Sequence, residues 1–371
     1  MKYLPPVPAC LVPVLLLSAV AARGQEIAEV AAVAEVEKTA EIRVEPYASQ
    51  PTAGEMEFVA AWKRFLLKQG EPHPGRYVAD LPFSFRCGER SSREWVKIET
   101  AQIESGAWLD DRTRMHTLRW NDDQTSLACE MQLTEFRDFP AFQWVVRVRN
   151  DGPTDVAHVH DFWGIDTCWN SPDGAMPTLH RSVGSPGHED DFHFRSEVMH
   201  NSMWDKRRRI AMDTPTNTHW GQTHSYNLPA DRRASAVWLP FFNYQTGPDG
   251  LITGLGWSGA WRAYFDHQGE GRSTILAGVE NLNTILHPGE TVRSTLNLVL
   301  YWQGEVLHGQ NMFRRLVLQH YSPRIDGQLV APPVSGLVWG GVPSAEHLEA
   351  IGKLRHYQIP CDVYWFDAGW Y

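Results

Sequence analysis

The sequence predicts a mainly β protein, in which a large antiparallel sandwich precedes one strand–helix–strand unit with parallel strands. Between Pro82 and Gly309, short stretches of alternating apolar and polar residues recur without helical patterns between them. Turn sequences such as Asn150-Asp151-Gly152 separate these stretches. Many short strands without intervening helices indicate packed antiparallel sheets, whereas the pattern after Gly309 alternates strand with helix.

The composition excludes several classes of protein. Of the 371 residues, 43% are hydrophobic and 16 are Trp, and disordered chains lack apolar surface on that scale. The 34 Lys and Arg residues and 44 Asp and Glu residues give a net charge of −10. Because a surface of that sign repels phosphate groups, neither nucleic acid nor an anionic membrane surface is an expected partner.

The amino terminus has the pattern of a secretory signal peptide. Lys2 precedes an apolar run from Leu11 to Val20, which is short for a membrane span, and small residues up to Ala22 suit a cleavage site. We therefore expect a signal peptide over residues 1–22 and a secreted or periplasmic protein with no membrane attachment after cleavage. The alternative is an uncleaved anchor.

Residues 23–53, which are rich in Ala, Val and Glu, predict an acidic arm, and residues 54–308 predict the sandwich domain. The domain opens with a helix over residues 55–67, where apolar residues recur at helical spacing. Strands follow, but residues 180–233 are rich in His, Asp and Arg and predict long loops at one end of the sheets.

Four cysteines follow the signal peptide: Cys87, Cys129, Cys168 and Cys361. Their spacing matches no disulfide framework, although an exported chain permits disulfides. The sequence predicts buried free thiols or at most one disulfide.

Residues 309–333 predict a helical linker, with the helix over residues 310–320, and residues 334–371 predict a βαβ unit. The strand, helix and strand of that unit are expected at residues 336–341, 344–359 and 361–371. Parallel strands need cover on both faces, and a complete (β/α)₈ barrel takes about 250 residues. We therefore expect the front portion of a longer protein, with a barrel that is incomplete in this chain.

Four motifs occur in order along the second half of the chain, at residues 239–261, 277–294, 309–324 and 363–371. The last reads Val-Tyr-Trp-Phe-Asp-Ala-Gly-Trp-Tyr. It resembles the end of the second barrel strand in glycoside hydrolase family 36, the α-galactosidase family, which reads Asp-Asp-Gly-Trp. The other three resemble that family's Trp-Ser-Gly strand, its Leu-x-Pro-Gly-Glu turn and its helix into the barrel. The resemblance implies an antiparallel β-supersandwich followed by the first β-α-β of a truncated (β/α)₈ TIM barrel.

The resemblance also implies a retaining hydrolase of α-galactosides or related α-glycosides, which uses no cofactor and no metal, and the predicted signal peptide adds that this hydrolase is exported. Such enzymes use two carboxylates about 5 Å apart, one as nucleophile and one as acid/base. The family carries both on later barrel strands, so no catalytic residue is assigned here and the chain alone is expected to be inactive. A non-catalytic carbohydrate-binding or structural β-sandwich and a raffinose-synthase-like glycosyl transferase stay open as alternatives, as does homo-oligomer formation.

The resemblance assigns substrate positioning to Asp367, Trp370, Trp339 and Trp257. Asp367 matches the first Asp of the motif, at the carboxyl end of a barrel strand, where a carboxylate can accept hydrogen bonds from sugar hydroxyls. The Trp residues would form apolar walls for a sugar ring. The alternatives are helix capping for Asp367 and core packing for the Trp residues. Ala368 stands where the family commonly has a second Asp. The alanine lacks the hydrogen-bond acceptor with which that Asp discriminates galactose from other hexoses.

No metal site is predicted. His158 and His160 lie at a spacing that puts both imidazoles on one face of a strand, next to Asp161, but no third or fourth ligand is evident nearby. Solvent-facing or loop-bonded histidines are therefore expected. Acid pairs such as Asp110-Asp111 lack the alternating spacing of a calcium loop and suit turns instead.

Overall fold

The computed structural model describes residues 49–71, 80–171, 174–185, 189–199, 208–213, 234–235, 237–269, 271–330 and 332–367. The predicted signal peptide and most of the predicted arm lie outside these residues. Within the described residues, no helix is long and apolar enough to cross a membrane.

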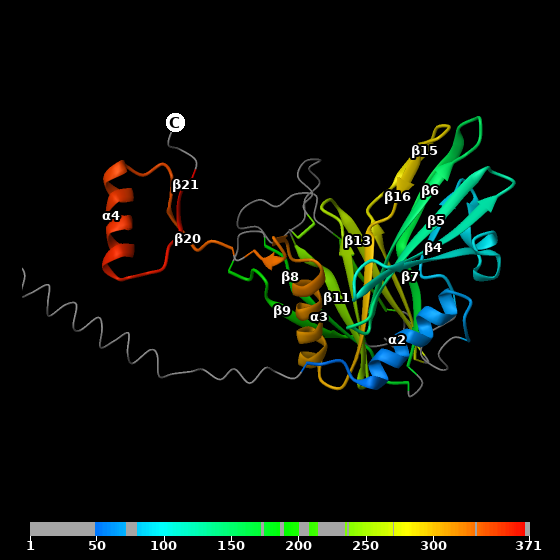
Figure 1. Ribbon diagram of the computed structural model, residues 1–371, viewed down its shortest axis with the longest axis horizontal. Helices are drawn as coiled ribbons and strands as arrows, with labels where there is room; N and C mark the ends of the chain where they lie inside the picture. The colour runs from blue at the N-terminus through cyan, green and yellow to red at the C-terminus, as the bar shows by residue number, and fades with distance from the viewer. Residues whose placement is uncertain are drawn as a thin grey trace, which may run out of the picture. The chain divides into compact units, whose positions relative to one another are not determined.

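Two large antiparallel sheets make up most of the described chain (Figure 1). The larger sheet has the order β3-β4-β5-β6-β17-β12-β11-β8-β9, with β16 paired to β6, and the smaller has the order β10-β13-β14-β7-β1-β2, with β15 paired to β7. The strands of the larger sheet are β3 (Gln102–Trp108), β4 (Thr113–Asp122), β5 (Leu127–Phe136), β6 (Ala141–Asn150), β8 (Thr178–Val183), β9 (Phe194–Val198), β11 (Trp238–Thr246), β12 (Asp249–Gly256), β16 (Thr291–Arg293) and β17 (Leu296–Gln303). Those of the smaller sheet are β1 (Ser84–Cys87), β2 (Arg90–Ser91), β7 (Val156–Asn170), β10 (Arg208–Asp213), β13 (Trp261–Gly269), β14 (Arg272–Val279) and β15 (Asn283–Leu286). Two short 3₁₀ turns, η1 (Ser92–Glu94) and η2 (Ile98–Thr100), lie between β2 and β3.

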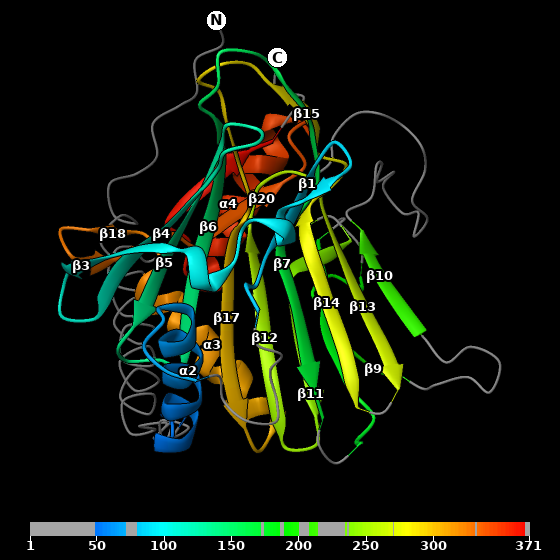
Figure 2. The same cartoon turned by 90° about the vertical axis from the view of Figure 1, so that its right-hand side faces the viewer.

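This arrangement confirms the predicted antiparallel, mainly β fold. Figure 2 shows β17 beside β12 in one sheet and the run β7, β14, β13 in the other. A single buried cluster contains residues of both sheets, such as Val146 and Phe265, so the core lies between them. Aromatic side chains fill much of it. Two of the buried indoles donate their N–H groups across the core: Trp144 to the Gly164 carbonyl at 2.8 Å and Trp169 to Thr246 Oγ1 at 2.9 Å.

The segment 180–233 contains more regular structure than its sequence indicates. It holds most of β8 together with β9 and β10, so the prediction of long loops was wrong for these stretches. The strand β9 shows why the sequence did not predict this structure. It is an edge strand of the larger sheet, and four of its five residues are exposed. A strand exposed in this way lacks the apolar alternation by which strands are recognised.

The helix α2 (Ala53–Leu66) begins at Ala53 rather than at residue 55 because a capping box precedes it. Thr52 Oγ1 accepts a hydrogen bond from the Glu55 backbone N–H at 3.2 Å, and the Glu55 carboxylate accepts one from the Thr52 N–H at 2.7 Å. The apolar face of α2 joins the sandwich core, where the Phe58 ring stacks on Tyr301 at 3.9 Å.

The helix α3 (Val306–His320) covers the outer face of the larger sheet at β17, and it begins four residues before the predicted position 310. Tyr301 of β17 faces the core between the sheets, whereas Leu300 and Trp302 pack with Met312 of α3. Alternate residues of β17 therefore face two buried layers. This explains why the strand reads as an almost continuous apolar run.

A buried carboxylate ties α2 to β17 and α3. Glu55 is fully buried, and its Oε1 accepts a hydrogen bond from the Gln303 backbone N–H at 2.7 Å and lies 2.9 Å from His308 Nε2. Because a buried carboxylate without partners is costly, these contacts fix the position of α2 against the outer layer.

A second carboxylate, Glu135 of β5, joins α2 to the larger sheet. Its Oε2 lies 3.0 Å from Lys63 Nζ, and its Oε1 lies 3.4 Å from His116 Nε2. Burial by itself raises the pKa of Glu135, but the neighbouring His116 and Lys63 outweigh burial and lower that pKa to about 2.

After α3 the chain forms a short hairpin, β18 (Arg324–Ile325) and β19 (Gln328–Leu329), and then the predicted βαβ unit. The unit consists of β20 (Ser335–Val338), α4 (Ser344–His356) and β21 (Val363–Phe366), and its two strands pair in parallel. Closure of a barrel around this unit stays a prediction.

The four cysteines after the predicted signal are free thiols. Cys87 and Cys129 are buried, as predicted, and burial raises the pKa of both thiols. Cys168 and Cys361 are only partly buried, which corrects the prediction for these two.

Replacing Glu135 by Gln should remove an acid-sensitive part of the stability. Because the folded-state pKa is lowered to about 2 from 4.5, the carboxylate stabilises the fold above pH 4.5 and loses this effect as the pH falls toward 2. Chemical denaturation should show that Glu135→Gln is less stable than the wild type near neutral pH and that the gap closes in this acid range. A gap independent of pH would contradict the assignment.

Two helical glycines give a matched test of the packing of α3 on Trp302. A Cβ at Gly309 would lie 2.5 Å from Trp302 Cγ, whereas nothing lies within 4 Å of a Cβ at Gly352 in α4. Gly309→Ala should therefore lower the unfolding free energy by about 1–3 kcal/mol through overpacking. Gly352→Ala should be neutral or stabilising, because alanine favours a helix over glycine by about 1 kcal/mol. Equal effects of the two substitutions on the denaturation midpoint would disprove this packing.

Candidate functional site

The parallel pairing of β20 and β21 determines which residues meet at the carboxyl ends of the two strands. Val338, the last residue of β20, pairs with Phe366, the last residue of β21. Trp339 directly follows Val338, and Asp367 directly follows Phe366. Two of the predicted site residues therefore follow neighbouring strands at the same end of the sheet. In parallel α/β folds, ligands bind at this end.

The helix α4 holds the strand pair from one face. His347 is only 5% exposed, its Nδ1 lies 3.1 Å from the Tyr364 hydroxyl, and its ring lies 4.6 Å from that of Phe366. A Cβ at Gly336 would lie 3.0 Å from Cδ1 of Leu354, so the glycine permits the close approach of α4 to β20.

The opposite face of the strand pair carries exposed apolar side chains. Leu337 and Trp365 are register partners and are 53% and 58% exposed, and Trp339 is 67% exposed. Contiguous exposed apolar residues of this size mark a surface that contacts another protein layer or a ligand.

The other predicted site residues lie elsewhere. Trp257 is half-buried in the connection from β12 to β13, on the sandwich, and Trp370 lies outside the described residues. Asp367 is half-buried. The structure thus brings Trp339 and Asp367 together through the strand register, while Trp257 belongs to a different part of the fold.

Trp339 and Asp367 offer two complementary kinds of contact. A carboxylate accepts charge-assisted hydrogen bonds from hydroxyl groups, and an indole presents an apolar face with a polar N–H at its edge. A polyhydroxylated ligand with an apolar ring face fits both groups.

The two histidines of β7 have local partners. His158 Nδ1 lies 2.6 Å from Asn283 Oδ1, and His160 Nε2 lies 2.9 Å from the Gly88 carbonyl oxygen. His158 is exposed, and His160 is bonded to the turn between β1 and β2, so the prediction of solvent-facing or loop-bonded histidines is confirmed. Among the described residues, no group of three or more His, Cys, Asp or Glu side chains is placed to hold a metal ion.

The acid pair Asp110-Asp111 forms a turn. Asp110 Oδ1 accepts hydrogen bonds from the backbone N–H groups of Arg112 at 2.8 Å and Thr113 at 2.6 Å. These bonds, together with one from the Thr113 hydroxyl, lower the pKa of Asp110. The turn explanation for this pair is confirmed.

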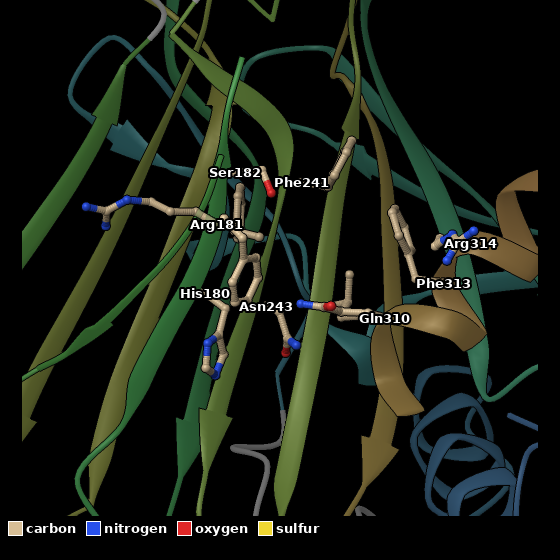
Figure 3. Close-up of a pocket in the computed structure, with 11 residues that line it drawn as sticks. His180, Arg181, Ser182, Phe241, Asn243, Gln310, Phe313 and Arg314 are labelled. Atoms are coloured by element: carbon tan, nitrogen blue, oxygen red, sulfur yellow. The ribbon is translucent and has the colours of Figure 1, made fainter. Parts of the chain in front are cut away.

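The sequence did not indicate a cleft that lies on the larger sheet beside α3 (Figure 3). Its volume is about 190 Å³, and residues of β8, β9, β11, β12 and α3 line it. These residues are spread between His180 and Arg314, so no local motif marks the cleft.

No family model and no curated protein matches the sequence, but solved structures do. A variant of a GH36 α-galactosidase from Geobacillus stearothermophilus, solved in complex with raffinose, matches with a TM-score of 0.58 at 11% identity, over 78% of this chain and 39% of its own. An α-galactosidase from Lactobacillus brevis matches with a TM-score of 0.55 at 14% identity, over 78% and 38% of the two chains. The galactosidase domain of an α-galactosidase–sucrose kinase matches with a TM-score of 0.57 at 10% identity, over 81% and 42%.

These matches show the fold. They confirm the mainly antiparallel β-sandwich that is expected from the resemblance to the amino-terminal portion of GH36 α-galactosidases. The chain spans about two-fifths of the length of these structures.

The close approach of α4 to β20 can be tested at Gly336. Gly336→Val should push α4 away, because the added side chain would start 3.0 Å from Leu354, and overpacking of this kind costs about 1–3 kcal/mol. Hydrogen exchange of the α4 and β21 amides should become about tenfold faster or more. Ser335→Val, at an exposed neighbouring position of β20, is the control and should leave exchange unchanged. If both variants exchange like the wild type, the described packing is wrong.

Proposed function

We propose that this chain is the amino-terminal part of an exported, retaining glycoside hydrolase that cleaves α-galactosides or related α-glycosides. The observation that carries the proposal is the parallel register of β20 and β21, which sets Trp339 and Asp367 at adjacent strand ends. This unit follows a sandwich whose fold matches that of GH36 α-galactosidases.

In this proposal, Asp367 binds hydroxyl groups of the substrate, and Trp339 and Trp370 form apolar walls around a sugar ring. Each hydrogen bond to a charged acceptor contributes about 1.5–3 kcal/mol. Trp257 approaches the same substrate from the sandwich. All four residues position the substrate, and none of them is assigned a catalytic role.

The reaction requires two carboxylates about 5 Å apart, one to attack the anomeric carbon and one to protonate the leaving group and then activate water. We assign both to later strands of the barrel, so the 371 residues alone are expected to bind but not to hydrolyse. The exposed face with Leu337 and Trp365 supports this assignment, since inward-facing residues of a barrel strand are covered by the other strands.

Ala368 limits how finely the substrate can be assigned. A site that hydrogen-bonds a hydroxyl discriminates strongly against sugars that present it differently, and Ala368 lacks the acceptor that the family commonly has there. The proposal therefore covers α-glycosides as a class, with galactosides first among them.

Export belongs to the same proposal. Residues 1–22 would be removed, which leaves the arm (23–53), the sandwich (54–308), the helical linker (309–333) and the start of the barrel (334–371). An oligosaccharide or glycoside outside the cell or in the periplasm would be the substrate.

The strand β21 offers a matched pair of carboxylates for the decisive assay. Asp367 follows the strand at its carboxyl end, whereas Asp362 precedes it and accepts a hydrogen bond from the Val334 backbone N–H at 2.9 Å. In a protein that carries this chain with a complete barrel, Asp367→Asn should lower kcat/KM for nitrophenyl α-galactoside by about tenfold or more. Asp362→Asn should stay near the wild-type value.

Three other results would contradict the proposal. Full activity of Asp367→Asn would show that this carboxylate only caps the next helix. Sugar binding without any turnover by the complete protein would indicate a non-catalytic carbohydrate-binding protein. Transfer of the glycosyl group to a sugar acceptor in preference to water would indicate a transferase.

A further inference from the structure

Aromatic rings from three different elements, β9, β11 and α3, line the cleft beside α3. Phe241 of β11 and Phe313 of α3 contact each other, with ring centroids 5.2 Å apart. Phe194 of β9 stacks on the imidazole of His180 with centroids 5.7 Å apart, and it is 45% exposed. Rings held in this way offer flat apolar surface that costs little conformational entropy to use.

His180 is a fixed support for Phe194. Its Nδ1 lies 2.8 Å from Ser196 Oγ and its Nε2 lies 2.8 Å from Gln245 Oε1, so both ring nitrogens have partners. Burial lowers the pKa of His180, which keeps the imidazole neutral at pH 7. The support therefore adds no charge to the cleft.

A buried amide in the cleft has an unused donor. Asn243 is 5% exposed, and its Oδ1 accepts a hydrogen bond from Trp302 Nε1 at 2.9 Å. Its Nδ2 has no hydrogen-bond partner among the described residues. An unsatisfied buried donor costs about 1–3 kcal/mol, which a ligand oxygen would relieve.

Two further polar side chains enter the cleft from opposite sides (Figure 3). Ser182 comes from β8 and Gln310 from α3, and Asn243 lies between His180 and Gln310 in the same view. Both side chains are half-buried and line the cleft. A hydroxyl and a side-chain amide can each donate a hydrogen bond to a ligand and accept one from it.

The charged side chains around the cleft determine which net charge its ligand can carry. The described residues that line it include no carboxylate, and Arg314 is exposed with its Nη1 3.3 Å from Asn311 Oδ1. Arg181 points away from the rings (Figure 3), with its guanidinium 4.4 Å above the Trp238 ring. Arg181 also pairs with Glu197 at 3.0 Å, so its charge is balanced outside the cleft. The aromatic and amide groups between the two arginines suit a neutral ligand.

We propose that this cleft is a carbohydrate-binding site that holds one pyranose unit of a neutral oligosaccharide. A pyranose has an apolar C–H face, which fits Phe194 and Phe241, and hydroxyl groups, which fit the amides of Asn243 and Gln310. The volume of about 190 Å³ is below the roughly 300–1,000 Å³ of sites for larger ligands, so one ring is enclosed and the remainder of the oligosaccharide extends outward. The proposal does not rest on hydrolysis.

The test of the site is whether the 371-residue chain binds raffinose. Binding is measured by saturation-transfer NMR and by titration calorimetry. The wild type should bind raffinose, and Phe194→Ala and Gln310→Ala should each weaken binding by about tenfold, which corresponds to about 1.4 kcal/mol. Phe192→Ala is the matched control, because this ring is 61% exposed two residues away and does not line the cleft. It should bind like the wild type.

Trp339→Ala and Asp367→Asn separate this proposal from the proposed function. If binding is lost only in these two variants and kept in the cleft variants, the strand-end site binds raffinose and the cleft proposal is overturned. No binding of raffinose or of maltotriose by the folded wild type would also overturn it. Loss of binding in Phe194→Ala and Gln310→Ala, with unchanged thermal unfolding, would support it whether or not the complete protein hydrolyses glycosides.

Discussion

The structure depends on the burial of both faces of β17, the middle strand of the larger sheet. Tyr301 faces the core between the sheets, and Trp302, one residue later, packs under α3. A Cβ at Gly250 of the neighbouring strand β12 would lie 2.0 Å from the Trp302 ring, so a glycine is needed there to make room for the indole. The Trp302 indole also donates to Asn243, and it thereby orients the amide that lines the cleft beside α3. One aromatic side chain thus links the sandwich, the helix that leads to the βαβ unit and the proposed carbohydrate site.

A second constraint acts at the other end of the chain. Parallel strands need a crossover helix, and the crossover through α4 places Trp339 and Asp367 after paired residues of β20 and β21. Antiparallel pairing would have put their strand ends at opposite edges. The proposed function therefore depends on strand direction as much as on residue type. Gly336 contributes to this arrangement because it allows α4 to pack closely on β20.

The sequence predicted those parts whose residues repeat with the period of their element. The sandwich strands, the helices and the βαβ unit follow from alternation and helical spacing. The start of α3 was placed too late because its first turn contains His308 and Gly309, whose places are set by Glu55 and Trp302 rather than by helix propensity. The exposed strand β9 lacks an apolar pattern, and the cleft it borders combines residues from distant segments, so neither could be read from local sequence.

The central claim is that the chain begins a glycoside hydrolase barrel, and reading the coding frame beyond the codon for Tyr371 tests it most directly. The account predicts that the frame continues through further strand–helix repeats, with the two catalytic carboxylates on later strands. Such a continuation would cover the exposed face of β20 and β21. A stop codon directly after Tyr371 would contradict the account, because two parallel strands and one helix cannot form the barrel that the proposed reaction requires.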